Sequence, residues 1–180
     1  MLNIYINKIT FILFEIFVIL IWKTVKSKNV TVENDVNVFI RDVLNNNEND
    51  DINFLFVRPY YNMTTDGQIE LKIKVNIEFI GNEEKTVIDF PQDNKASLIN
   101  CSFSGTKPLT VKFKNFIIRN YNTHESYPLF NIQKNEMEYD YQFIFENCIF
   151  LNNDSILRVD TYCGKENKQK SIIFNNCDFM

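Results

Sequence analysis

The chain has 180 residues, a formal net charge of −4 and a sequence pI near 5.1, so it is long enough for one domain with a hydrophobic core. No basic run or patch stands out, which gives nucleic-acid binding little support. The 17 Phe residues accompany only 4 Gly and 4 Pro, and Asn is abundant. Because Phe and Ile favour strands and Asn tolerates left-handed backbone, the composition predicts many strands joined by corners made of Asn.

The first 28 residues differ from the rest of the chain. An apolar run from Ile9 to Trp22, interrupted by Glu15, is followed by the basic stretch "KTVKSK". Its length matches the apolar region of a signal peptide, whereas a helix that spans a bilayer needs roughly 20 residues. Glu15 and the lysines after the run disfavour simple cleavage, so an uncleaved anchor and a buried core helix stay open. We expect residues 1–28 to be a signal peptide or signal anchor, and the protein to be secreted or held on the extracellular face of a membrane.

Export would expose the chain to glycosylation and to an oxidising compartment. Four N-x-Ser/Thr sequons mark possible glycosylation sites, although an Asn-rich chain also produces sequons by chance: Asn29, Asn62, Asn100 and Asn153. Four cysteines could pair in such a compartment: Cys101, Cys148, Cys163 and Cys177. Their spacing is not that of a zinc site, and we expect neither a metal nor a cofactor.

Hydrophobic periodicity predicts the elements that follow. Asn29–Asn34 is predicted to be a short strand and Asp35–Asn46 a short amphipathic helix, and after residue 46 the pattern has a period of two. The clearest strand candidate is Ile69–Phe79, "IELKIKVNIEF", which Gly81 and Asn82 turn. The other strand candidates, bounded by turn residues, are "INFLFVRPYY", "TVIDF", "ASLINCSF", "LTVKFKNFIIRN", "PLFNIQ", "YQFIFENCIFLNN", "ILRVDTY" and "SIIFNNCDF".

One short phrase recurs in the second half of the chain, at a spacing of roughly 30 residues. Its aligned positions are Val111, Phe113, Asn115, Phe116 and Ile118; Phe143, Phe145, Asn147, Cys148 and Phe150; and Ile172, Phe174, Asn176, Cys177 and Phe179. Repeats of this length are typical of solenoids, in which equivalent residues of successive coils stack. The segment "LINCSF" has the same phrase but lies too close to Asn115 for a full coil, so it belongs to a different face or is a chance match.

These patterns predict an all-β fold: a short parallel β-helix of about three coils with an N-terminal capping helix. Phe over Phe would fill its interior, and Asn over Asn would form a hydrogen-bonded ladder at the corner. A small antiparallel β-sandwich is the alternative, and it would require hairpin turns between neighbouring strands.

The phrases "VKFKNFIIRN", "FIFENCIFLNN" and "IIFNNCDF" resemble the coils of the pectin-lyase-like right-handed parallel β-helix proteins. "DVNVFIRDVL" is similar to the short helix that caps their N-terminal end, and "IKVNIEFIGNEEKTVIDF" is similar to their early coil. The resemblance implies a right-handed parallel β-helix domain over residues 29–180. It implies no activity, because the Asn-Thr-Asp, Gly-His-Gly and Arg-Ile-Lys motifs of polygalacturonase-like members are missing.

Few residues suggest chemistry, and each also has a structural explanation. His124, the only histidine, has no partner at a meaningful spacing and is expected on the surface. An acidic group could hold calcium or protonate a sugar oxygen, or merely cover solvent-facing strands: Glu146, Asp154 and Asp160. Two cations could bind a polyanion or only keep the surface soluble: Arg119 and Arg158. Three tyrosines could stack on sugar rings or cover an edge of the core: Tyr60, Tyr61 and Tyr162.

Cys148 and Cys177 are aligned on neighbouring coils. Neighbouring strands lie about 4.8 Å apart, which is within the range that a disulfide accepts. The two residues could equally stack as small apolar side chains.

The chain stops at "CDFM", inside the repeated phrase. A parallel coil ending there has an open, Phe-rich edge, so we expect either a domain truncated at its C-terminal end or self-association through that edge. The expected function is that of a non-catalytic extracellular or cell-surface domain, structural or weakly binding to a cell-wall or extracellular polysaccharide. The alternative is the N-terminal fragment of a polysaccharide lyase or glycoside hydrolase whose active site lies in missing coils.

Overall fold

The computed structural model of the protein describes residues 27–33, 40, 43–44, 46, 50–63, 69–90, 99–104, 107–122, 127–133, 141–160 and 172–180. The predicted signal or anchor segment lies outside them, apart from Ser27 and Lys28, which begin the first strand. Across the described ranges, no helix has the length and apolar character needed to cross a bilayer.

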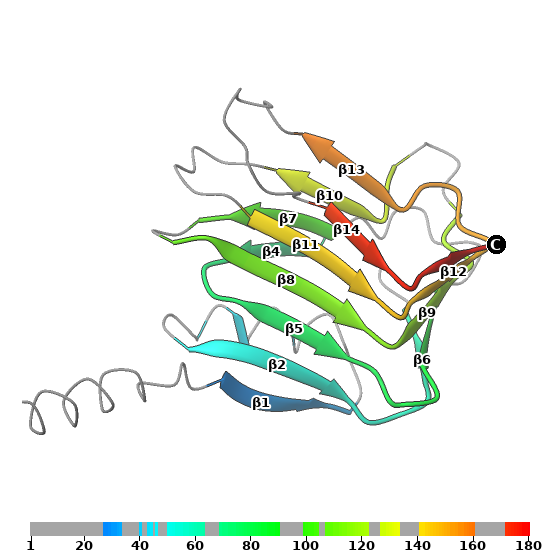
Figure 1. Cartoon of the computed structure of the whole chain (residues 1–180), viewed down its shortest axis with the longest axis horizontal. Coiled ribbons are helices and arrows are strands. Elements are labelled where there is room, and N and C mark those ends of the chain that lie inside the picture. Colours follow the sequence, from blue (N-terminus) through cyan, green and yellow to red (C-terminus); the bar gives the residue numbers. More distant parts are fainter. Residues whose placement is uncertain are drawn as a thin grey trace, which may run out of the picture.

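The strands form three sheets, and all the paired neighbours run parallel (Figure 1). Sheet A contains β1 (Ser27–Val32), β2 (Asp51–Phe56), β5 (Ile77–Ile80), β8 (Leu109–Lys114), β11 (Tyr141–Glu146) and β14 (Ile172–Asn175), in that order. Sheet B contains β3 (Tyr60–Asn62), β6 (Thr86–Asp89), β9 (Phe116–Arg119), β12 (Ile149–Leu151) and β15 (Asp178–Phe179). Sheet C contains β4 (Ile69–Ile73), β7 (Ile99–Phe103), β10 (Phe130–Gln133) and β13 (Leu157–Asp160).

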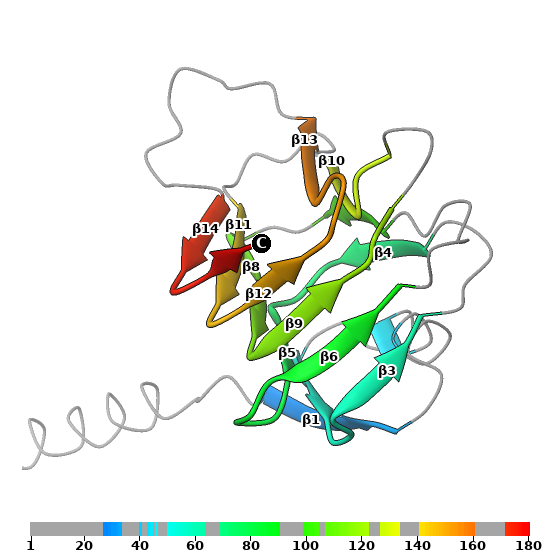
Figure 2. The ribbon, with the colours of Figure 1, turned by 90° about the vertical axis from the view of Figure 1, so that its right-hand side faces the viewer.

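From β2 onward the chain visits sheets A, B and C in rotation (Figures 1 and 2). We call these circuits coil 1 (β2–β4), coil 2 (β5–β7), coil 3 (β8–β10) and coil 4 (β11–β13), and β14 and β15 begin coil 5. The parallel stacking agrees with the predicted parallel β-helix and contradicts the antiparallel sandwich. The prediction of about three coils is too low, because the described strands complete four circuits.

The corner between sheets A and B explains the low count. In coils 3, 4 and 5 a single residue in left-handed backbone makes this corner: Asn115, Asn147 and Asn176, with φ of 63°, 54° and 52°. In coil 1 the corner is the segment 57–59, and in coil 2 it is the segment 81–85. The Asn phrase therefore marks only the later coils, although the earlier ones follow the same path.

Two strand candidates in which no corner was predicted also contain one, so each is wrong as a single strand. The stretch 52–61 divides into β2 and β3, and Ile69–Phe79 divides into β4 and β5, which belong to different sheets. In Ile69–Phe79 the alternation of buried and outward-facing residues continues through the corner between β4 and β5, since Ile73, Val75 and Ile77 are all buried. The chain bends at Val75, between β4 and β5.

Hydrogen bonds fix Asn76 to the coils on either side. Its backbone N–H and its Nδ2 donate to the two carboxylate oxygens of Asp51, at 3.1 and 3.0 Å. Its Oδ1 accepts the backbone N–H of Thr110, at 2.9 Å. Equivalent residues of successive coils are 25 to 34 positions apart, as the pairs Asp51–Asn76 and Asn76–Thr110 show.

Stacked phenylalanines fill the interior, as the repeat predicted. The rings of Phe54, Phe79, Phe113, Phe145 and Phe174 follow one another along sheet A, with centroid separations of 5.2, 4.5, 5.4 and 5.0 Å. Complete burial of such a ring contributes about 1.5–3 kcal/mol. The pairing of Phe145 with Phe113 and with Phe174 confirms the predicted register.

The remaining elements agree with the predictions as far as they are described. The strand predicted at residues 29–34 is β1, and "LINCSF" contains β7, which lies in sheet C and so on a different face from β8. In the segment predicted as a capping helix, Ile40, Val43 and Leu44 are helical, and Ile40 and Leu44 belong to the buried core.

Candidate functional site

A group of polar side chains lies on the outer face of sheet B, where β3, β6 and β9 run side by side (Figure 2). We call it the Tyr60 cluster, and it consists of Tyr60, Asp89, Arg119 and Asn120. The alternation of the strands turns these side chains outward, and the register pairs Asp89 with Arg119 directly. Asn120 follows β9 in left-handed backbone, with φ of 60°.

The carboxylate of Asp89 is the centre of the cluster. Its Oδ2 accepts hydrogen bonds from the Tyr60 hydroxyl at 3.0 Å, from Arg119 Nε at 3.0 Å and from Arg119 Nη2 at 2.7 Å. Its Oδ1 accepts one from Asn120 Nδ2 at 2.8 Å. The guanidinium carbon of Arg119 lies 5.9 Å from the centroid of the Tyr60 ring, a cation–π distance.

These contacts determine the charge of the cluster. Partial burial alone would raise the pKa of Asp89, but the hydrogen bonds from Arg119, Asn120 and Tyr60 outweigh it and lower this pKa below its ordinary value. The hydrogen bond to Asp89 raises the pKa of Tyr60 and that of Arg119. At neutral pH the cluster therefore contains an anion, a cation and a neutral phenol, and none of them exchanges a proton near pH 7.

The arrangement suits recognition better than proton transfer. The side chain of Tyr60 is 45% exposed, and Asp89 and Arg119 hold its hydroxyl in place. An exposed aromatic ring gives the apolar face of a sugar a flat surface, and the charged groups beside it can bond to hydroxyls.

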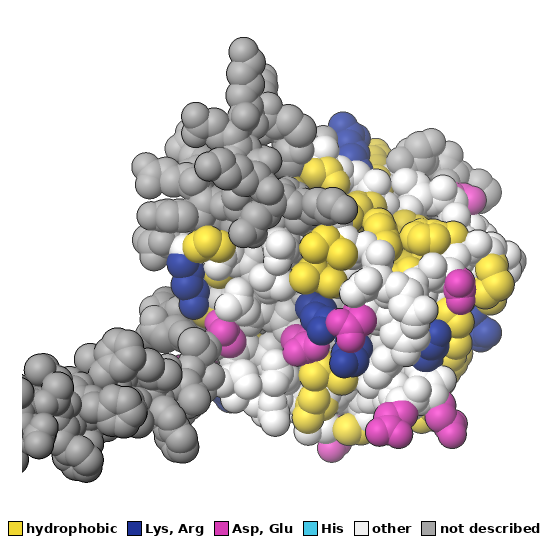
Figure 3. Space-filling model, in the orientation of Figure 1, with side chains coloured by type: hydrophobic (Ala, Val, Ile, Leu, Met, Phe, Trp, Pro, Cys, Tyr) yellow, Lys and Arg dark blue, Asp and Glu magenta, His cyan; other side chains and the backbone are white. Residues whose placement is uncertain are grey.

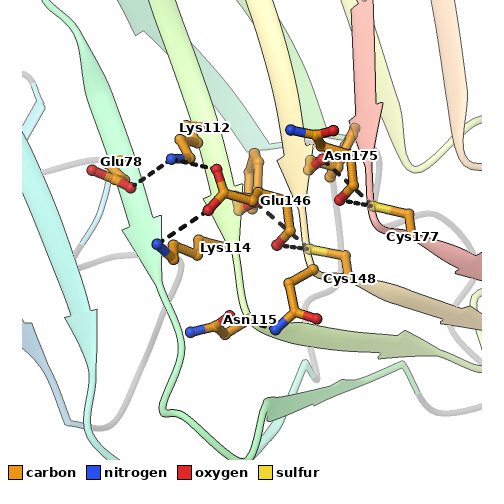
Figure 4. A network of polar contacts seen from close by, with 11 residues as sticks. Glu78, Lys112, Lys114, Asn115, Glu146, Cys148, Asn175 and Cys177 are labelled. Carbon is orange, nitrogen blue, oxygen red and sulfur yellow. Dashed lines mark hydrogen bonds and ion pairs between the residues drawn. The ribbon is translucent and has the colours of Figure 1, made fainter.

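A second polar network lies on the outer face of sheet A. Lys112 Nζ lies 3.4 Å from a carboxylate oxygen of Glu78 and 2.7 Å from one of Glu146, and Lys114 Nζ lies 3.1 Å from the other oxygen of Glu146 (Figure 4). Figure 3 shows basic and acidic side chains interspersed on this face. Hydrogen bonds from Lys112 and Lys114 lower the pKa of Glu146. Glu146 therefore holds neighbouring strands together.

The structure does not bring the predicted acidic group together. Glu146 lies in sheet A, Asp154 lies at an exposed bend after sheet B, and Asp160 ends β13 in sheet C. Asp154 donates its backbone N–H to the carbonyl of Tyr121 at 2.9 Å. For the residues with described positions, no cluster of three His, Cys, Asp or Glu side chains could hold a metal ion.

The other candidates divide between the core edge, the surface and the undescribed part of the chain. Tyr61 is buried: its hydroxyl donates to the carbonyl of Val32 at 2.5 Å and accepts the N–H of Arg58 at 3.0 Å, so it covers an edge of the core. Arg158 is exposed on β13. His124, Tyr162 and Cys163 lie outside the described residues.

Cys148 and Cys177 lie on neighbouring coils, as predicted, and no disulfide joins the described cysteines Cys101, Cys148 and Cys177 in this structure. Each thiol contacts a carbonyl of the preceding coil: Cys148 Sγ lies 3.6 Å from the oxygen of Phe113, and Cys177 Sγ lies 3.5 Å from that of Phe145. Burial raises the pKa of Cys148 to about 11 and that of Cys101 to about 12. A disulfide between Cys148 and Cys177 stays a prediction.

The four sequon asparagines occupy different environments. Asn29 and Asn62 are exposed, whereas Asn100 and Asn153 are half-buried. Asn153 uses both ends of its amide, since Oδ1 accepts the N–H of Tyr121 at 3.0 Å and Nδ2 donates to the carbonyl of Ile118 at 2.9 Å. Asn100 Oδ1 accepts a bond from Asn131 Nδ2 at 3.0 Å.

Sequence reasoning found Tyr60 and Arg119 but missed Asp89 and Asn120. A signal was present, because Asp89 and Arg119 are 30 residues apart, close to the spacing of the repeat. Extending the repeat toward the N-terminus would have placed them side by side.

Comparison of the chain with protein-family models, with curated proteins and with solved structures gives no match. The description of the fold and of the candidate site therefore rests on the strand pairing and the side-chain contacts of this chain itself.

Proposed function

We propose that the protein is a non-catalytic domain of an extracellular or cell-surface protein, folded as a right-handed parallel β-helix like those of the pectin-lyase-like superfamily. Its role would be structural, with weak binding of an extracellular polysaccharide on the outer face of sheet B. The parallel coils, the repeated phrase and the apolar N-terminal run support this proposal.

The observation that carries the binding proposal is the exposed ring of Tyr60. The bonds from Tyr60 and Arg119 to Asp89 hold the ring in one orientation. A ring that is already ordered loses little side-chain entropy when a sugar packs on it. A single ring of this kind supports weak affinity, which a polysaccharide with repeated units would raise through multivalency.

The test is binding of the full chain, produced in bacteria and therefore without N-glycans, to soluble neutral and acidic polysaccharides. We expect Tyr60→Ala to weaken retention in affinity electrophoresis about tenfold, equivalent to about 1.4 kcal/mol. Tyr127→Ala is the matched control, because Tyr127 is 41% exposed and lies outside the cluster. Equal binding by the two variants would contradict the proposal, and shortening of the polysaccharide would favour the alternative of a lyase or hydrolase fragment.

Self-association through coil 5 belongs to the same proposal. Phe174 and Phe179 are 40% and 57% exposed, whereas their stacking partners Phe145 and Phe150 are buried. Pairing of this edge with a second copy would bury both rings. Sedimentation over a range of concentrations tests this, and Phe179→Asn should shift the chain toward the monomer; a monomer at every concentration would contradict it.

A further inference from the structure

Asn62, one of the four sequon asparagines, lies on the same face of β3 as Tyr60. The strand consists of Tyr60, Tyr61 and Asn62, and its side chains are exposed, buried and exposed in turn. Residues two positions apart in a strand point to the same side, about 6–7 Å from each other. Asn62 therefore presents its amide to solvent beside the Tyr60 cluster.

The ring of Tyr60 extends toward Asn62. In the parallel register Asn62 pairs with Asp89, and Tyr60 pairs with Val87. The Tyr60 hydroxyl nevertheless bonds to Asp89 Oδ2, at 3.0 Å, so the ring leans along the strand toward the position of Asn62. A group attached to Asn62 Nδ2 would thus meet the exposed part of the Tyr60 ring. β3 is the outermost of the described strands of sheet B.

The amide of Asn62 is available for modification, unlike that of Asn153. Within the described part of the chain, the Asn62 side chain makes no hydrogen bond. A sugar on Asn153 Nδ2 would disturb its bond to the carbonyl of Ile118 and the corner that this bond fixes. Asn29 is exposed as well, but its neighbours on the same face of β1 are Ser27 and Thr31, which offer no aromatic surface.

We propose that Asn62 carries an N-linked glycan and that the ring of Tyr60 is the surface on which its first sugar packs. The inference rests on the proposed export of the chain. It means that the sugar on the Tyr60 ring would be attached covalently to Asn62 of the same chain. The Asn62 glycan and a free polysaccharide would bind the Tyr60 ring in the same way, with a sugar ring packed on the aromatic ring. The glycan would occupy the Tyr60 ring before a free polysaccharide could.

The glycan would be transferred by the secretory machinery of the cell, with a lipid pyrophosphate oligosaccharide as co-reactant. Asn62 Nδ2 attacks the anomeric carbon of the first sugar, and an N–C bond forms. The bond from that carbon to the pyrophosphate oxygen breaks, the lipid pyrophosphate leaves, and Nδ2 loses one proton to a base of the transferase. Because the chain acquires the glycan as it enters the compartment, a chain modified at Asn153 would be hindered in reaching the native state, whereas a glycan on the exposed Asn62 is compatible with it.

The first test uses the full chain, translated in the presence of microsomes, with digestion of the folded product by a glycosidase that cleaves N-linked glycans. We expect a mass shift that Asn62→Gln reduces by one glycan, as does Thr64→Ala, which destroys the sequon but keeps the asparagine. Asn153→Gln should leave the glycan in place and should lower the melting temperature. A folded product without a glycan at Asn62, or with one at Asn153, would overturn the proposal.

The second test asks whether Tyr60 contacts the glycan. Removal of the glycan should lower the melting temperature by about 2–4 °C when residue 60 is Tyr or Phe, and by much less in Tyr60→Ala. Tyr60→Phe is the matched control, since it keeps the ring and loses only the hydroxyl that bonds to Asp89. An equal change in all three proteins would show that Tyr60 does not support the glycan.

The two proposals fail separately. The chain made in bacteria tests polysaccharide binding without any N-glycan, whereas the microsomal product tests the modification whether or not a polysaccharide binds. If both hold, Asn62→Gln made in microsomes should bind polysaccharide better than the glycosylated chain, and equal binding would exclude occupation of the Tyr60 ring by the glycan.

Discussion

The corners between sheets A and B differ in length and sequence between the first two coils and the later ones, although both kinds make backbone hydrogen bonds to the next coil. In coil 2 the corner runs from Gly81 to Lys85, and the N–H of Gly81 donates to the carbonyl of Lys114 at 2.8 Å. In coil 3 the corner is the single residue Asn115, and its N–H donates to the carbonyl of Glu146 at 3.1 Å. Both therefore continue the bonding from one coil to the next.

The difference lies in the side chains. Asn147 Nδ2 donates to Asn115 Oδ1 at 2.8 Å, and Asn176 Nδ2 donates to Asn147 Oδ1 at 3.2 Å, so these corners bond to one another through identical residues. The longer corner of coil 2 is held by contacts of its own, such as that from the N–H of Asn82 to Thr86 Oγ1 at 3.0 Å. Coils can therefore pair through their backbones with different residues at their corners. A repeat appears in the sequence only where identical side chains also stack.

Truncation of the Phe ladder should have the largest effect. Phe145 is fully buried between Phe113 and Phe174, so Phe145→Ala should lower the free energy of unfolding by about 3–5 kcal/mol, measured by urea denaturation. Phe174→Ala is the control from the same ladder, and its exposure should reduce the loss to about 1 kcal/mol. Equal losses would mean that coil 5 is as well packed as coil 4.

The corner of coil 2 can be tested at Gly81. A Cβ at this position would overlap the carbonyl oxygen of Asn115 and approach the Thr86 side chain to 3.1 Å. Because a backbone atom cannot move aside easily, Gly81→Ala should cost about 3 kcal/mol, the upper part of the range for overpacked sites. A cost below about 1 kcal/mol would show that this corner shifts freely and is less rigid than those made by Asn.

The Asn ladder should have a moderate effect. Asn147→Ala loses two side-chain hydrogen bonds and places a Cβ of Ala in left-handed backbone, so we expect about 2–3 kcal/mol in the same assay. Asn147→Gly removes the bonds alone and should cost about 1 kcal/mol. If Gly and Ala cost the same, the left-handed backbone of Asn147 would not be what selects asparagine.

Acidic pH should have the smallest effect on the free energy of unfolding, and it should act on the early coils and on the later ones. Bonds from neighbouring groups lower the pKa of Asp89, which links coils 1 to 3, and that of Glu146, which links coils 3 and 4. A carboxylate with a lowered pKa stabilises the fold at neutral pH, and this stabilisation is lost as the pH falls below the ordinary values of 3.8 and 4.5.

The measurement is the urea midpoint as a function of pH. Asp89→Asn and Glu146→Gln should each flatten the fall in stability below about pH 4.5, and Asp178→Asn, at an exposed position in β15, should not. An unchanged acid response in the double variant would mean that other carboxylates govern it.

The sequence predicted most where like residues stack. The register of Phe113, Phe145 and Phe174 follows from three copies of one phrase, and the structure confirms it. The first two coils lack that phrase, and the alternation of Ile73, Val75 and Ile77 hides a corner, because a residue can stay buried while the chain changes sheets. In the Tyr60 cluster the spacing of 30 residues between Asp89 and Arg119 was a usable signal, but the repeated phrase that would have called attention to it is missing from coils 1 and 2.

The coil lengths have a practical consequence for engineering. Equivalent residues are 25, 34, 32 and 29 positions apart in successive coils, yet each of the three Asn corners has only one residue in left-handed backbone. The three Asn corners share one geometry, so the differences in length between these later coils lie in their other connections, and the entropic cost of a longer surface connection grows slowly with its length. An epitope or a peptide tag grafted into such a connection should therefore be tolerated. A single residue inserted beside Asn147 would instead shift the following residues out of register with their stacking partners in the preceding coil.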